Sequence, residues 1–303
     1  MAEVQTNRNA SGIVLPAEVS SQIWSDAQNA SVVMQHASRI DLPGEGLTVP
    51  IITGDPTATW VGESEEIGVG DSTFGSKTIT GQKVGIIELF SNEFRRDLPA
   101  LYAALAERLP KTIAAAYDAR VFHGTSLPTG FDGLRAAQGI RLSAATAYAD
   151  AVEIDSAIYE ANGVTDAWTL APKARRELLN AQDDNGNPLL LSNLVDGRNV
   201  PSILGADVDY ARAVYKADEA GDGVGEAGGE TLGYAGQWSG NAFYGVVQDL
   251  SVSISTEATV NKGGTQVNLF QRDMFALKVT AHLGFAVRDL SKFVRITGSN
   301  AVA

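Results

Sequence analysis

The chain has 303 residues, of which 44% are hydrophobic and 19% are charged, so it can bury a sizeable core and is not disordered throughout. Its 36 acidic and 23 basic side chains give a net charge of -13, which argues against a protein that binds nucleic acid by neutralising phosphates. The absence of cysteine excludes a disulfide framework, a thiolate metal site and a thiol nucleophile.

The N-terminal residues show no targeting pattern. Met1–Asn9 has neither the basic start nor the apolar run of a signal peptide. No uninterrupted apolar run reaches the roughly 18 residues that cross a bilayer. We therefore expect a soluble chain that is intracellular when it is made.

A polar arm and a short helix are predicted at the start of the chain. Residues 1–12 are polar and small, and Leu15-Pro16 follows them. Apolar residues then recur at helical spacing up to Trp24, which predicts a helix that ends near Asn29. Val32–Ile40 and Leu47–Ile52 are predicted strands, separated by a turn at Pro43-Gly44-Glu45-Gly46.

The next stretch predicts a long two-stranded ribbon. Its flanks, Ile51–Val61 and Thr78–Ile87, are rich in β-branched residues, and the middle, Gly62–Ser72, is turn-rich and acidic. A two-stranded ribbon is marginally stable by itself in water. We therefore expect it to lie on another surface, and another copy of the same chain can supply that surface.

A long helix is predicted after the ribbon. Asp97 is a suitable N-cap, and Pro99 lies in the first turn, where its missing N–H does no harm. Apolar residues recur every three or four positions from Leu98, and Gly124 marks the end. The helix has about 25 residues and is roughly 37 Å long. Pro110 in its middle predicts a bend.

From Asp150 to about residue 258 the pattern predicts alternating helices and short strands. Val152, Ile154, Ile158 and Tyr159 indicate a helix that stops at Gly163. A strand over Trp168–Leu170 and a helix over Pro172–Ala181 follow, which indicates an α/β domain. Its most polar segment, Asp218–Glu230, is predicted to be a solvated loop, since its spacing matches neither an EF-hand nor a phosphate loop.

The last part of the chain predicts β structure. Phe243–Gln248 and Ser251–Ser255 are predicted as two strands, and Asn261-Lys262-Gly263-Gly264 as a hairpin turn. Apolar residues then occupy every odd position from Phe275 to Val287. This alternation predicts a strand of about fourteen residues with one buried face, roughly twice the usual strand length.

The sequence offers no constellation for catalysis. His36, His123 and His282 are far apart and have no carboxylate or second histidine at ligand spacing, so we expect structural roles for them and no metal site. No cofactor is expected. An enzyme with a pocket in residues 150–258 is the alternative from another class, and the lack of a His, Cys or paired-carboxylate arrangement argues against it.

Several short motifs occur in an order typical of a known family. They are Leu15-Pro16, Trp60-Val61-Gly62-Glu63, Phe74, Phe90-Ser91, Asp97-Leu98, Tyr117-Asp118, Phe122-His123-Gly124, Pro128-Thr129-Gly130, Leu170-Ala171-Pro172, Asp184-Asn185-Gly186 and Val287-Arg288-Asp289. Taken in this order, they resemble the HK97-fold major capsid proteins of tailed bacteriophages over residues 13 to 297.

This resemblance implies an α+β fold with the parts of that family. These are an N-arm (1–30), P-domain strands (31–57), the extended E-loop ribbon and its return (58–97), the P-domain spine helix with its following loop (98–149), an α/β A-domain (150–258) and P-domain return strands (259–303).

The resemblance also implies a structural protein without enzymatic activity. It would assemble into pentamers and hexamers of an icosahedral shell around double-stranded DNA, which it would enclose without sequence specificity. The implied partners are further copies of the chain, a portal, a separate scaffolding protein and a decoration protein, and no membrane. The virion is its implied location, with assembly in the host cytoplasm. The alternative is an encapsulin-like shell that holds protein cargo.

The ribbon supplies the expected contacts between subunits. Trp60 and Phe74 either pair with each other across the ribbon or anchor it in the next subunit. The acidic tip would meet basic residues of a neighbour. The predicted contact set is Trp60, Glu63, Glu65, Glu66, Phe74, Lys77, Arg95, Arg96 and Arg108.

Two lysines lie in the predicted ribbon. In some relatives an E-loop lysine is joined covalently to an asparagine of a neighbouring subunit. Lys77 and Lys83 are the lysines in this segment, and exposed or ion-paired side chains are the alternative role for both.

Overall fold

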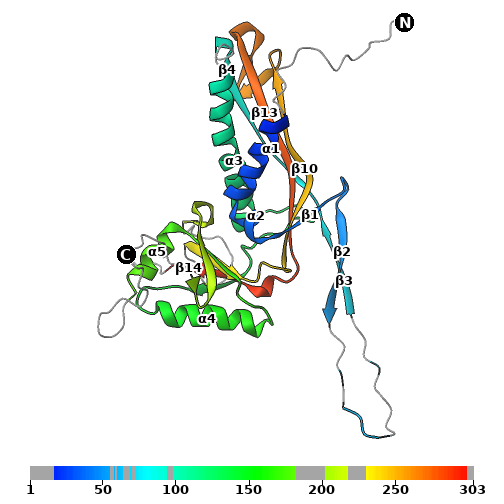
Figure 1. Ribbon diagram of the computed structural model, residues 1–303, viewed down its shortest axis with the longest axis vertical. Helices are drawn as coiled ribbons and strands as arrows, with labels where there is room; N and C mark the ends of the chain where they lie inside the picture. The colour runs from blue at the N-terminus through cyan, green and yellow to red at the C-terminus, as the bar shows by residue number, and fades with distance from the viewer. Residues whose placement is uncertain are drawn as a thin grey trace. The chain divides into compact units, whose positions relative to one another are not determined.

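The computed structural model describes residues 17–54, 58, 60–63, 69, 73–93, 98–181, 202–217 and 230–298. The chain divides into two compact units (Figure 1). The first comprises Met1–Gln35, Gln82–Asp118 and Gln248–Leu283, and the second comprises His36–Gly81, Ala119–Val247 and Gly284–Ala303. Within the described ranges, no helix combines the length and the apolar character that crossing a membrane requires.

The N-terminal helix is confirmed, and the strand predicted after it is partly wrong. Helix α1 covers Ala17–Ala30, but a short helix α2, Val32–His36, precedes strand β1, Ser38–Asp41. The Ser31 hydroxyl oxygen accepts a hydrogen bond from the backbone N–H of Met34 at 3.2 Å, which caps this short helix. The β-branched residues that suggested a strand, Val32 and Val33, are buried in helical conformation.

The predicted long helix is confirmed as α3, Leu98–His123, with 26 residues. It runs alongside strands β4 (Gln82–Ser91) and β13 (Met274–Val287) (Figure 1). Its described apolar stripe is buried, with Leu109, Ile113 and Tyr117 at most 3% exposed. Pro110 lies inside the helix. The predicted N-cap, Asp97, is outside the described residues.

The ribbon is shorter than predicted. Strand β2, Leu47–Gly54, pairs antiparallel with β3, Thr73–Ile79. The predicted second flank continued to Ile87, but β4 pairs with β13 instead, over ten residue pairs from Met274↔Ser91 to Leu283↔Gln82. The chain leaves the ribbon at Thr80, whose N–H donates to Gly130 O at 2.8 Å. The fourteen-residue strand β13 thus offers β4 a longer partner than the ribbon does.

The predicted long strand is confirmed in length and in pattern. β13 has 14 residues, and all seven of the odd-numbered apolar positions are buried. Its sheet has the order β1-β10-β13-β4. Strand β10 runs without a break over Ala242–Ser255, so the prediction of two strands was wrong. Leu250, at the predicted break, is buried and continues the strand.

The predicted hairpin turn is confirmed at the end of the first unit. Strands β11 (Thr259–Lys262) and β12 (Thr265–Asn268) pair antiparallel around Gly263 and Gly264. Both glycines have positive φ, 58° and 85°, as a two-residue type I′ turn requires. The short helix η3, Phe270–Arg272, follows and leads into β13.

The second unit is built on a six-stranded mixed sheet with the order β5-β14-β9-β6-β8-β7. The predicted strand Trp168–Leu170 is confirmed as β6, Ala167–Leu170. Two strands come from outside residues 150–258, namely β5 (Gln138–Arg141) and β14 (Phe293–Thr297). The remaining strands are β7 (Ser202–Ile203), β8 (Ala206–Tyr210) and β9 (Thr231–Gly236), and two short helices are η2 (Arg212–Val214) and η4 (Leu290–Lys292).

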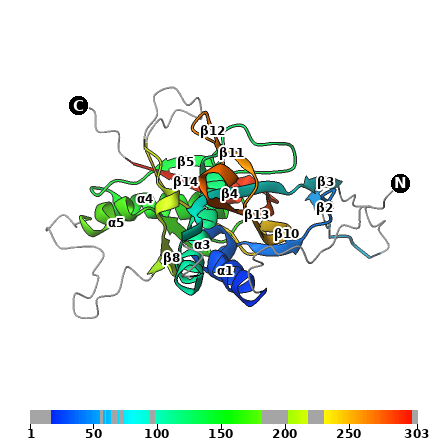
Figure 2. The ribbon, with the colours of Figure 1, turned by 90° about the horizontal axis from the view of Figure 1, so that it is seen from above.

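Two helices cover part of this sheet, and both were predicted. They are α4, Ala147–Glu160, which packs on β5, β9 and β14, and α5, Pro172–Leu179, which packs on β6 and β9 (Figure 2). They share one apolar core with the sheet, whose largest fully buried members include Trp168, Leu142 and Ile154. Of the residues that predicted α4, Ile154 and Ile158 are buried, whereas Val152 and Tyr159 face outward.

The core under α4 gives a stability test. Ile154→Ala should lower the free energy of unfolding of the unassembled subunit by about 2–4 kcal/mol, because Ile154 is fully buried and the truncation leaves a cavity. Denaturant unfolding measures this change. Ser156→Ala, on the exposed side of the same helix, is the matched control, and equal losses in the two variants would contradict the packing described for α4.

Candidate subunit interface

The tip of the ribbon exposes large apolar side chains. Trp60 is fully exposed and Val69 is 92% exposed, and Val61 and Glu63 are also exposed. Covering exposed apolar groups of this size with another surface lowers the free energy, because it removes them from water. The tip therefore has the chemical character of a contact surface.

The predicted contact residues are only partly described. Glu65, Glu66, Arg95 and Arg96 lie outside the described residues, and only the backbone of Phe74 is described, in β3. Arg108 is exposed on α3, in the first unit. The pairing of the acidic tip with these arginines in a neighbouring subunit stays a prediction.

An ion pair fixes the base of the ribbon. The Lys77 ammonium lies 2.6 Å from Asp132 Oδ2 and donates a hydrogen bond to the carbonyl oxygen of Val287. The same carboxylate oxygen accepts the backbone N–H of Val287 at 2.8 Å. Lys77 therefore has the ion-paired role that the sequence left as an alternative, and the ribbon is tied to the end of β13.

A second contact closes the same corner. The Thr80 hydroxyl donates to Thr129 O at 2.9 Å, beside the backbone bond to Gly130. Gly130 has φ +84°, and a Cβ there would lie 2.7 Å from the Thr80 hydroxyl oxygen. Only glycine fits this conformation and this approach. The loop that contains Gly130 and Asp132 thus contacts the chain at Lys77 and at Thr80, where it leaves the ribbon.

An apolar pocket of about 210 Å³ opens beside the ribbon base. The lining is apolar apart from two basic side chains, Lys77 and Arg288. The lining residues are Ile40, Val49, Lys77, Ile79, Phe243, Ala286, Val287 and Arg288. Its wall includes both strands of the ribbon and the end of β13, which are joined by the contact of Lys77 with Asp132 and Val287.

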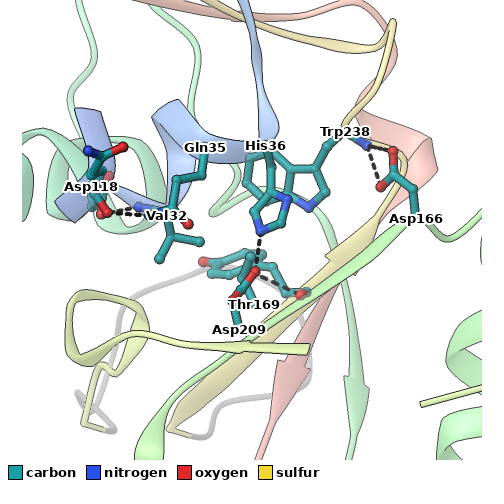
Figure 3. Close-up of polar contacts among 10 residues, drawn as sticks. Val32, Gln35, His36, Asp118, Asp166, Thr169, Asp209 and Trp238 are labelled. Carbon is teal, nitrogen blue, oxygen red and sulfur yellow. Dashed lines mark hydrogen bonds and ion pairs between the residues drawn. The ribbon is translucent and has the colours of Figure 1, made fainter. Parts of the chain in front are cut away.

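A buried carboxylate joins the N-terminal helices to α3 in the first unit (Figure 3). Asp118 is 2% exposed, accepts the Ser31 hydroxyl at 2.5 Å and accepts the N–H of Val32 at 3.1 Å. Burial raises the pKa of Asp118 from its ordinary value of 3.8 to about 6, because removal from water disfavours the charged form. The hydrogen bonds from Ser31 and Val32 oppose this change of pKa in part.

The sequence contains a signal for this buried carboxylate. Asp118 follows Ala114 by four positions and precedes Val121 by three, so it lies on the buried side of the helix. A carboxylate on an apolar stripe indicates a polar partner that the rest of the chain must supply. Here Ser31, next to a helix start, supplies it.

The histidines have structural contacts. His36 Nε2 lies 2.6 Å from Asp209 Oδ2, and its ring centroid is 5.7 Å from that of Trp238 (Figure 3). His123 Nε2 contacts Ala213 O at 2.8 Å, and burial lowers its pKa. Among the described residues, no group of three or more His, Cys, Asp and Glu is arranged to hold a metal ion.

Asp166 positions the loop that carries Trp238. Its carboxylate accepts the N–H of Trp238 at 2.9 Å and the N–H of Ser239 at 2.7 Å. Trp238 is almost fully buried, and its ring meets Phe293 edge-on at 5.1 Å. This arrangement joins the residue before β6, the turn after β9 and the start of β14.

The model of the "Phage capsid family" matches residues 11–298. The chain is 28% identical over 302 residues to the "Probable major capsid protein gp17" of Mycobacterium phage L5, covering 95% of this chain and 90% of that protein. It is 23% identical to the "Major capsid protein" of Staphylococcus phage 80alpha, covering 92% and 83% of the two chains.

Solved structures show the same fold. A chain of Mycobacterium phage Adephagia superposes with a TM-score of 0.70 at 21% identity, covering 90% of this chain and 91% of that chain. A chain titled "Capsid of native GTA particle computed with C5 symmetry" gives a TM-score of 0.66 at 15% identity, covering 99% and 96%.

The buried carboxylate makes a pH prediction. The folded state binds a proton at Asp118 more tightly than the unfolded state, so protonation should stabilise the subunit as pH falls from about 6 to about 4. A difference of about two pKa units corresponds to roughly 3 kcal/mol. Urea unfolding of the unassembled wild type and of Asp118→Asn, compared at pH 4.5 and pH 7, should show the wild type gaining about 2 kcal/mol relative to the variant at pH 4.5, because the full value is reached only below pH 3.8. Identical pH dependence in the two proteins would contradict it.

The clamp at the ribbon base makes a second prediction. Lys77→Met keeps the aliphatic stem and removes the charge that faces Asp132, so the unfolding free energy should fall by about 1 kcal/mol, a value limited by the partial exposure of both groups. In the Lys77→Met/Asp132→Asn double variant the loss should be smaller than the sum of the single losses. Strict additivity would show that the two side chains do not interact.

Proposed function

This chain belongs to the phage capsid family and is a major capsid protein that forms a phage capsid shell, and from that premise we propose that it builds the shell on the HK97 plan. Copies would assemble into pentamers and hexamers of a closed icosahedral lattice. The family match over residues 11–298 is the observation that carries this proposal, because it spans both units. None of the relatives reported above supports an encapsulin-like shell.

The described elements support an assignment of parts. The β2–β3 ribbon and its tip correspond to the E-loop, and α3 with the β4–β13 pair corresponds to the spine of the P-domain. The six-stranded sheet with α4 and α5 corresponds to the A-domain. Residues 1–30 correspond to the N-arm. This assignment extends the A-domain beyond residues 150–258, because β5 and β14 complete its sheet.

The ribbon would make the contact between neighbouring subunits. Between Ile40 and Lys77 the chain has seven acidic residues and no basic one, so the ribbon is strongly negative. The exposed Trp60 would be covered by the neighbour, and the carboxylates around Glu63 would meet Arg95, Arg96 and Arg108 of that copy. Each contact is modest, but every copy makes several at once, and the sum stabilises the shell.

The composition supports an enclosing role toward DNA. A net charge of -13 disfavours tight binding to phosphates, so packaged double-stranded DNA would be held by the closed wall and without sequence specificity. We propose a structural role without catalysis, assembly in the host cytoplasm, and partners that include a portal, a separate scaffolding protein and a decoration protein. The final location is the capsid of the virion.

The assembly experiment tests this function. Purified chain, alone and co-expressed with the other head proteins of its genome, should form closed shells visible by negative-stain microscopy and sedimentation. The Arg95→Glu/Arg96→Glu variant should reduce the shell yield by roughly tenfold or more, since it places like charges opposite the acidic ribbon. Only amorphous or monomeric material from the wild type under both conditions would overturn the function.

Lys262→Glu is the matched control for the ribbon contact. It reverses one exposed charge in the β11–β12 hairpin, away from the proposed arginines in sequence. Its shell yield should equal that of the wild type. If the double variant assembles as well as this control, the acidic ribbon has a different partner.

A further inference from the structure

Helix α4 exposes an apolar stripe beside the face that packs on its sheet. Tyr148 is 64% exposed, Val152 is 39% exposed and Tyr159 is 55% exposed. Their spacings of four and seven residues place them one above the other on a single helix face. The adjacent face of the helix, with Ala147, Ala151, Ile154 and Ile158, is buried in the core. The stripe therefore does not belong to the core of the second unit.

A pocket adjoins the N-terminal end of this stripe. It has a volume of about 270 Å³. Tyr148 and Leu204 line it, and both side chains are exposed. Leu204 has φ +48°, a conformation that costs free energy for a branched side chain. The remaining lining comes from α4, α5 and β7: Ala147, Ala151, Leu178, Ala181, Ser202 and Ile203. Pocket and stripe form one continuous apolar surface, here named the α4 surface.

The charged side chains on α4 itself have one sign. Helix α4 contains Asp150, Glu153, Asp155 and Glu160 and no lysine or arginine. Asp150 accepts hydrogen bonds from Ser143 N and Thr146 Oγ1, and Asp155 accepts one from Thr165, so these two act within the fold. Glu153 and Glu160 are exposed. Whatever covers the stripe must tolerate or complement these two carboxylates.

The charge pattern excludes a contact between two α4 surfaces. A two-fold contact of that kind would bring Glu153 and Glu160 of both copies together, and like charges in a desolvated contact are costly. A contact with a different, basic surface has no such cost. The same unit carries exposed arginines on its other helical segments, Arg176 in α5 and Arg212 in η2. Arg176 is 66% exposed and pairs only with the neighbouring Glu177 among the interactions described for it.

We propose that the α4 surface binds a second copy of this chain in a head-to-tail contact, in which the second copy presents its exposed arginines, Arg176 and Arg212. This inference rests on the proposed shell, since a shell places copies of the chain side by side. A contact between two different surfaces of one chain closes into a ring when it repeats by rotation. The α4 surface would thus be a ring contact, separate from the ribbon contact.

Removal of the apolar stripe is the first test. Tyr148→Ser/Tyr159→Ser should lower the yield of closed shells by roughly tenfold or more, because buried tyrosines often dominate the binding energy of an interface. The melting temperature of the unassembled subunit should stay unchanged, since both rings are exposed there. Ser156→Ala, on the same helix, is the control and should assemble normally. Normal shell yield from the double variant would overturn the proposal.

The melting temperature separates another occupant from a second copy. Ala181 and Ser202 both line the pocket, and residues 182–201 connect them in the sequence. If the chain's own segment 182–201 covered the α4 surface, the double variant would unfold at a lower temperature even without assembly. That result would overturn the proposal as well.

A charge exchange is the second test. Glu153→Lys/Glu160→Lys and Arg176→Glu/Arg212→Glu should each reduce the shell yield, and the chain that carries all four changes should recover most of it. A fourfold variant no better than either double variant would overturn the pairing. The wild type is measured in parallel: shells from the wild type together with unaffected α4 variants reject only this contact, whereas a wild type that forms no shell rejects the proposed function and this contact with it.

Discussion

The hydrogen-bond ladder between β13 and β4 is the constraint on which the first unit depends. Ten consecutive pairs align Met274–Leu283 with Ser91–Gln82, and the alternation of side chains then decides which face is buried. A slip by one residue would expose Phe275, Leu277 and Val279 together. The ladder thus fixes the register of a strand whose far end, in the second unit, receives the ribbon clamp at Val287.

Polar side chains set the corners where elements change direction. Asp118 meets the start of α2, Asp132 meets the end of β13, and Asp166 meets the loop before β10. In each case a carboxylate accepts a backbone N–H that has no partner in a helix or sheet ladder, which removes the cost of burying that donor. Asn241 does the same at Asp289, with two bonds of 2.9 Å. Apolar contacts stabilise the elements, and these groups determine how consecutive elements join.

Sequence patterns predicted the elements whose signal is periodic and long. The stripe that begins at Leu98 gave α3, and the alternation from Phe275 to Val287 gave β13. Short β-branched runs gave wrong predictions in two places. Val32 and Val33 follow a cap that starts a helix, so they are not in a strand. Lys83–Ile87 pairs with β13 and not with the ribbon. Pairing partners and buried polar links depend on residues more than eighty positions apart, as with Ser31 and Asp118. Local spacing does not contain that information.

The same limit applies to the candidate site. Trp60 and the acidic tip were identifiable from composition, whereas the outward turn of Tyr148 and Tyr159 became visible only when the inward face of α4 was known. Of the four tryptophans, Trp24, Trp168 and Trp238 are buried, and Trp60 is fully exposed. The intrinsic fluorescence of the chain therefore separates into three indoles that report on folding and one that reports on what surrounds the ribbon. Trp60 is therefore an intrinsic fluorescence probe of the ribbon surface that a neighbouring subunit is expected to cover.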